Sequence, residues 1–63
     1  MRDPERINRI IERIRAIWLT QPDTRLTQLI MNALNMNSDP YYVEDDLLEE
    51  RLKQYEETLK LME

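Results

Sequence analysis

The chain has 63 residues, a net charge of −4, and no cysteine, histidine or glycine. A chain of this length forms one domain at most, and it buries only about 60% of the surface that its unfolded form exposes. Disulfides are excluded as a source of stability, and a structural metal site nearly so, since Cys and His are its usual ligands. We therefore expect one domain over 1–63 that relies on regular helix packing or on self-association.

The composition also excludes whole classes of function. Without glycine, the chain lacks the Gly-rich loops that cradle phosphates, and a turn with positive φ has to use asparagine. The N-terminal sequence MRDPERINRI is too charged for a secretory signal, and no segment approaches the roughly 20 apolar residues of a membrane span. We expect a cytoplasmic protein that has no membrane association and no cofactor.

A first helix is predicted over 4–20. Asp3 can cap it, and Pro4 suits the first helical position. Its apolar residues recur at helical spacing on a single stripe, opposite a face rich in arginine and glutamate. The stripe consists of Ile7, Ile10, Ile11, Ile14, Ile17 and Trp18.

A second helix is predicted over 24–35, directly after the break at Pro22. Proline stops the first helix, and Asp23 is a candidate N-cap for the next. The apolar face comprises Leu26, Leu29, Ile30, Ala33 and Leu34. With so short a connection, the two helices should form a hairpin or cross steeply.

The segment 35–43 is predicted to be the main loop, because Asn, Ser, Asp and Pro are concentrated in it. A very short extended segment is expected at 41–43, where it could form one bridge to Thr24–Leu26. In such a segment, adjacent side chains point to opposite sides, so one of Tyr41 and Tyr42 could be buried while the other faces solvent or a partner.

A third helix is predicted over 44–62, which makes the fold an all-α three-helix domain. Asp46 and Glu49 have the spacing of a capping box. The apolar residues recur at heptad spacing, as in a seam that packs on the other helices or on a second copy. These residues are Leu48, Leu52, Tyr55, Leu59 and Met62.

Charge is distributed unevenly. Residues 1–38 hold six basic and four acidic side chains, a net charge of +2, whereas 39–63 hold three and nine, a net charge of −6. This asymmetry could help the last helix dock on the first, could orient a symmetric dimer, or could belong to a solvated surface.

The acidic run from Glu44 to Glu50 is interpreted as a helix start. Acidic side chains in a first turn are stabilised by the free backbone N–H groups there. A calcium loop, in contrast, would require glycine. Paired carboxylates could serve acid–base chemistry, but the chain has no histidine and is too short for a sizeable pocket. We predict neither a metal site nor an enzyme.

Five residues are candidates for partner binding: Tyr41, Tyr42, Gln28, Met31 and Asn32. An exposed tyrosine is a common binding anchor, and Met31 lies on the polar side of its helix. Amides such as Gln28 and Asn32 can read bases in a helix-turn-helix protein, but the net charge of −4 argues against nucleic acid.

Three stretches of the sequence resemble one group of short proteins. They are R-I-x-x-I-x-x-x-I in the first helix, W-x-x-x-P-D-x-R-L-x-Q-L-I-x-N over 18–32, and D-P-Y-Y-V-E-D-D-x-L over 39–48. The pattern is similar to that of uncharacterised helical proteins of bacteria and phages, although Thr27 stands where the pattern often has glycine. The resemblance implies origin and fold, but no activity and no site residues.

The favoured hypothesis is a non-enzymatic protein-interaction module that forms a homodimer and binds an unidentified protein through Tyr41, Tyr42 and the second helix. The alternative is an acidic phage-type inhibitor whose last helix occupies a basic or nucleic-acid-binding groove of a host protein. A nucleic-acid binder that uses the Arg-bearing first helix is the third hypothesis.

Overall fold

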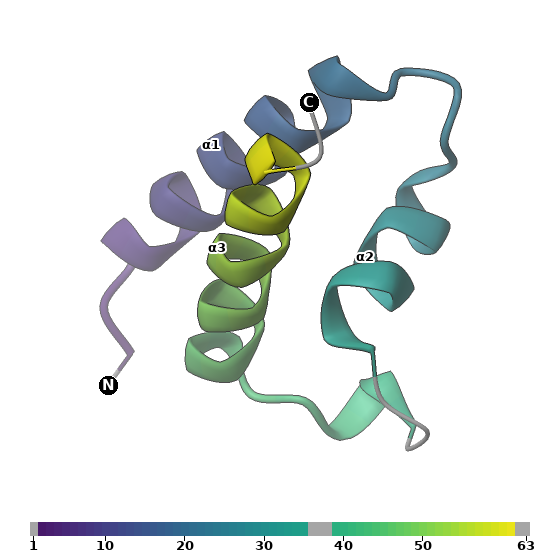
Figure 1. Cartoon of the computed structure of the whole chain (residues 1–63). Helices are drawn as coiled ribbons and strands as arrows, with labels where there is room; N and C mark the ends of the chain where they lie inside the picture. The colour runs from purple at the N-terminus through teal and green to yellow at the C-terminus, as the bar shows by residue number, and fades with distance from the viewer. Residues whose placement is uncertain (1, 36–38, 62–63) are drawn as a thin grey trace.

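Three α-helices run up, down and up in a computed structural model that describes residues 2–35 and 39–61 (Figure 1). Helix α1 spans Glu5–Thr20, α2 spans Leu26–Leu34, and α3 spans Asp45–Leu61, while a short 3-10 helix, η1, spans Pro40–Tyr42. The predicted all-α three-helix domain is confirmed, and the described residues include no strand.

Helix α1 begins and ends close to the predicted positions. The Asp3 carboxylate accepts a hydrogen bond from the backbone N–H of Glu5 at 2.9 Å, so it satisfies one of the free donors of the first turn. At the other end, the N–H of Gln21 donates to the carbonyl of Trp18 at 3.0 Å, directly before Pro22. Proline thus ends this helix as expected.

Helix α2 begins later than predicted, and Asp23 is not its N-cap. Arg25 occupies that position, and its N–H donates to Oε1 of Gln28 at 3.2 Å. The indole Nε1 of Trp18 donates to the Thr24 carbonyl at 2.7 Å. That carbonyl is therefore engaged by a tertiary contact, so Thr24 stays in the turn and the helix starts at Leu26.

Helix α2 ends at an asparagine in the left-handed region. Asn35 has φ 46° and is the one described residue with positive φ, in accord with the expectation for a chain without glycine. Nη1 of Arg51 in α3 also reaches the Leu34 carbonyl at 3.4 Å. The end of α2 is therefore satisfied partly by a side chain from another helix.

The prediction of an extended segment at 41–43 is wrong. Within the described residues these positions form no bridge, and Tyr41 and Tyr42 belong to η1. The Asp39 carboxylate accepts from the N–H of Tyr41 at 2.9 Å, and the Pro40 carbonyl accepts from the N–H of Val43 at 3.1 Å. These local hydrogen bonds satisfy the backbone that a strand partner would otherwise have to satisfy.

The start of α3 also departs from the prediction. Asp46 lies inside the helix, where its carboxylate accepts from the N–H of Leu47, and Glu49 binds Arg9 of α1. The predicted capping box is therefore absent, because the ion pair with α1 recruits the glutamate that would complete it.

The core lies where α3 contacts the other two helices (Figure 1). It is built around Ile17 of α1, Leu29 and Ala33 of α2, and Leu52 of α3, all of them buried. Four of the five predicted seam residues, Leu48, Leu52, Tyr55 and Leu59, pack into this core, and Met62 lies outside the described residues. The seam therefore joins helices of one protomer.

The apolar stripe of α1 is wider than the core it covers. Ile10, Ile14 and Trp18 pack partly against the core, but Ile7 is 49% exposed and Ile11 is 56% exposed. Two of the six residues of the predicted stripe therefore lie at the surface, because a small three-helix core does not have room for the whole stripe. In addition, none of the helices in the described residues has the length and apolar character needed to cross a membrane.

Candidate protein-binding surfaces

A row of ion pairs joins α1 and the segment before it to α3. Arg2 pairs with Glu44 at 2.6 Å, Arg6 with Asp45 at 2.8 Å, Arg9 with Glu49 at 2.9 Å, and Arg13 with Glu56 at 2.7 Å. The residue numbers rise together along both helices, so α1 and α3 run parallel. The charge asymmetry of the sequence thus docks the last helix on the first.

These contacts also change two titrating groups. The hydrogen bond from Arg6 lowers the pKa of the Asp45 carboxyl, with further help from the charges of Arg6 and Arg2 and with desolvation acting in the opposite direction. The hydrogen bond to Glu49, together with the charge of that carboxylate, raises the pKa of the Arg9 guanidinium. Both shifts favour the charged forms that hold the row together.

The same pairing bears on the acidic-inhibitor hypothesis. Glu44, Asp45, Glu49 and Glu56 are paired with arginines within the fold, so their charges are partly neutralised there. Acidic side chains such as Asp46, Glu50 and Glu57 stay free of ion pairs within the described residues, but they are interleaved with Lys53 and Lys60. No structural observation favours that hypothesis.

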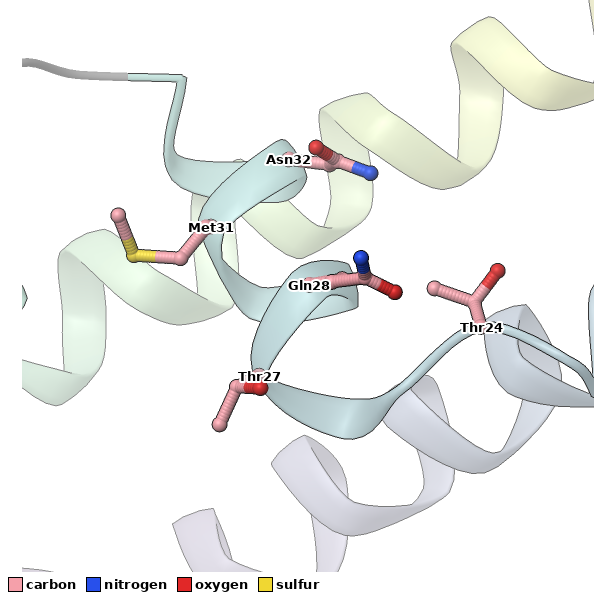
Figure 2. Close-up of a pocket in the computed structure, with 5 residues that line it drawn as sticks. All are labelled: Thr24, Thr27, Gln28, Met31 and Asn32. Atoms are coloured by element: carbon pink, nitrogen blue, oxygen red, sulfur yellow. The ribbon is translucent and has the colours of Figure 1, made fainter.

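The outward side of α2 carries three of the predicted partner-binding residues together. Gln28, Met31 and Asn32 line one open pocket of about 380 Å³ with Thr24 and Thr27. Figure 2 shows the amides of Gln28 and Asn32 pointing to the same side as Thr24, whereas Met31 points away from them. This surface is a shallow hydrogen-bonding strip with an apolar edge, suited to contact with another macromolecule rather than to enclosing a small molecule.

Tyr41 and Tyr42 form a second candidate surface on η1. Both side chains are exposed, 83% and 77%, and their rings meet edge to face with centroids 5.1 Å apart. The expectation that one of them is buried is wrong, because the 3-10 turn directs both rings away from the core. Among the described residues, no hydrogen bond joins these tyrosines to the amides of Gln28 and Asn32.

A third surface, which we call the α1 groove, was not predicted. It is a hollow of about 650 Å³ between the second half of α1 and the start of α2. Six apolar side chains line it, namely Ile11, Ile14, Trp18, Leu19, Pro22 and Leu26, and Glu12 and Arg15 are its charged members. Leu19 is 68% exposed and Leu26 is 41% exposed.

The sequence did contain a signal for the α1 groove. Ile7, Ile11, Ile14 and Trp18 are spaced 4, 3 and 4 apart, which is a heptad seam of its own. These residues also belong to the single stripe predicted for this helix, and only the tertiary structure shows that Ile17 is buried while Ile7 and Ile11 stay exposed.

The described residues offer little to reaction chemistry. Among residues 2–35 and 39–61, no group of three carboxylate, imidazole or thiol side chains is arranged to hold a metal ion. No side-chain nitrogen or oxygen buried in this part of the chain lacks a hydrogen-bond partner.

Comparisons with known proteins do not extend this picture. No family model, curated protein or solved structure matches the chain. The resemblance to short bacterial and phage helical proteins therefore stays a prediction that rests on the quoted patterns alone.

Proposed function

We propose that this protein is a small non-enzymatic interaction module that self-associates and binds a separate protein through η1 and the outward side of α2. The observation that carries the proposal is the pair of exposed tyrosines on η1, whose rings are in edge-to-face contact. Burial of such side chains by a partner would add apolar contact area and hydrogen bonds at the same time.

The tyrosines are held in place before any partner arrives. The Asp39 carboxylate accepts a hydrogen bond from the N–H of Tyr41, and the Asp39 carbonyl accepts one from the N–H of Tyr42 at 3.3 Å. Pro40, which lies between Asp39 and Tyr41, restricts the backbone further. Because two rings in mutual contact lose little further freedom on binding, the entropic cost of using them as anchors is low.

The polar strip on α2 supports the same proposal. Gln28 and Asn32 present amides that can both donate and accept hydrogen bonds, and Met31 beside them adapts to the shape of a partner. A polar, adaptable strip and a rigid aromatic pair are typical components of a protein interface.

Site-specific photo-crosslinking tests the partner surface. A benzophenone amino acid replaces Tyr42 in the full chain, and the same amino acid replaces Lys53, exposed on α3, as the matched control. The proposal predicts that position 42 yields one defined heterologous adduct in cells of the source organism and that position 53 does not.

A second variant separates binding from folding. Tyr41→Ala combined with Tyr42→Ala should abolish the adduct formed by a benzophenone at Met31, while helicity and melting temperature stay within a few degrees of the parent, since neither ring is buried. Equal labelling from positions 42 and 53, or an adduct that persists without the tyrosines, would overturn the proposal.

A further inference from the structure

We propose that a second copy of this chain occupies the α1 groove, with the two α1 helices antiparallel across a two-fold axis and Glu12 of each copy paired with Arg15 of the other. The inference rests on the proposed self-association and assigns it a surface and a symmetry. It does not depend on the tyrosine surface.

The apolar residues at heptad spacing in α3, which could have packed on a second copy, are not free to form a dimer seam. Leu52 is fully buried, and Leu48, Tyr55 and Leu59 pack against the same core. A dimer built on that seam would have to open the protomer. Self-association therefore needs an apolar surface that the folded protomer leaves exposed.

The α1 groove is such a surface. Ile11 and Leu19 are 56% and 68% exposed, and the half-buried Trp18 forms part of the wall, held there by its hydrogen bond to Thr24. Ile7, one turn before Ile11, continues the exposed apolar row along α1. A contiguous apolar strip on so small a protein indicates an interface.

The charges of α1 indicate which occupant the groove takes. Arg6, Arg9 and Arg13 are paired with α3, whereas neither Glu12 nor Arg15 forms an ion pair within the described residues. Both belong to the groove. One acid and one base, both unpaired on one surface, are self-complementary in charge, which is what a second copy requires.

Helix geometry then fixes the orientation. Positions 12 and 15 are three residues apart, so their side chains lie on the same flank of α1. When two copies pack antiparallel about a two-fold axis, each flank meets the same flank of the partner, and when they pack parallel, opposite flanks meet. Only the antiparallel arrangement therefore brings Glu12 close to Arg15 of the other copy.

The apolar row supports the same arrangement. Its spacing of 4, 3 and 4 from Ile7 to Trp18 reads the same in both directions, so an antiparallel copy sets Ile11 against Ile14 and Ile7 against Trp18. The midpoint of this row lies between residues 12 and 13, and the midpoint of the charge pair lies between 13 and 14. Both patterns are thus centred on the same turn of α1.

Charge exchange tests the pairing. The dissociation constant of the dimer is measured by sedimentation equilibrium over a dilution series, with the fluorescence of Trp18, the single tryptophan, as a second readout. Glu12→Arg and Arg15→Glu should each weaken association about tenfold, because symmetry repeats every like-charge contact twice. The double variant E12R/R15E should restore it to within about threefold of the parent.

An apolar variant tests the groove itself. Ile11→Lys should weaken the dimer by about 100-fold or more, since the substituted residue enters the interface from both copies. Ile11 is already half exposed, so the monomer should keep its helicity. The matched control is Leu47→Lys, an exposed apolar residue of α3 outside the groove, which should leave the dissociation constant unchanged.

The outcomes separate this inference from the proposed function. A dimer that tolerates Ile11→Lys and all charge exchanges would overturn the groove assignment while leaving self-association to another surface. A parent chain that is monomeric at every concentration would overturn both, and the crosslink at position 42 would still decide whether a separate partner is bound.

Discussion

The two interfaces of α3 differ in kind. Towards α2, the contact is made by buried apolar side chains, since Leu29 and Ala33 belong to the same buried cluster as Leu52. Towards α1, a row of partly exposed ion pairs accompanies Ile10, Ile14 and Ile17. Apolar burial supplies most of the stability and is tolerant of orientation, whereas charge pairs are weak and specific in position. We infer that the first interface holds the fold together and the second sets the parallel alignment of α1.

Among the changes considered, removing a core side chain should lower the free energy of unfolding the most. Leu52→Ala should lower the free energy of unfolding by about 2–4 kcal/mol, because it removes buried methyl groups and leaves a cavity. Urea denaturation followed by circular dichroism measures the change. The matched control Leu47→Ala, on the same helix but 39% exposed, should cost under about 1 kcal/mol. Equal losses in the two variants would contradict the primacy of the apolar interface.

Breaking the most sheltered ion pair should have an intermediate effect. Arg13 and Glu56 are 32% and 20% exposed at their side chains, less than the other pairs in the row. Glu56→Gln should therefore cost about 1 kcal/mol, and a double-mutant cycle with Arg13→Met isolates the coupling between them. Glu57→Gln, a neighbour without an ion pair within the described residues, is the control. A coupling free energy near zero would show that the ion pair between Arg13 and Glu56 does not contribute to stability.

Acid should weaken the α1 interface by a smaller amount, and the direction follows from the pKa of Asp45. Its pKa is lowered in the folded state by the hydrogen bond from Arg6, so the unfolded chain takes up a proton first as the pH falls. The contribution is complete above the ordinary aspartate value of about 3.9 and is lost as the pH falls through the lowered value.

Thermal melts of the parent and of Asp45→Asn provide the measurement. The parent should melt higher near pH 6, and the two curves should converge as the pH falls through the lowered pKa of Asp45. Asp46→Asn is the control, because that carboxylate forms no ion pair in the described part of the chain. A parent that keeps its advantage in strong acid would show that the Arg6 contact does not depend on charge.

The amount of this structure that could be predicted differs between its elements. Helix α1 was placed to within one residue because Asp3 and Pro4 act through their own backbone neighbours. The start of α2 was placed too early because Trp18, six residues before Thr24, takes the carbonyl that an earlier start would use. The capping box of α3 failed for a similar reason, since Glu49 binds a guanidinium forty residues away in the sequence.

The candidate surfaces show the same division. The grouping of Gln28, Met31 and Asn32 followed from helical spacing alone, and the structure places them around one pocket. The exposure of both tyrosines and the existence of the α1 groove did not follow from spacing. Each depends on which side of a short segment the rest of the molecule covers.

By itself, the sequence determined the three α-helices, the breaks at Pro22 and Asn35, and the charge complementarity of the first and last helices. Those features arise from backbone preferences and hydrogen bonds within a few residues, and from net charge, which needs no coordinates. The tertiary structure alone decided which residues of the α1 stripe are buried, which carboxylates are paired, and that the heptad seam of α3 is internal. Burial and pairing depend on what lies opposite a side chain, and in a core with room for so few residues, the rest of each apolar stripe stays at the surface.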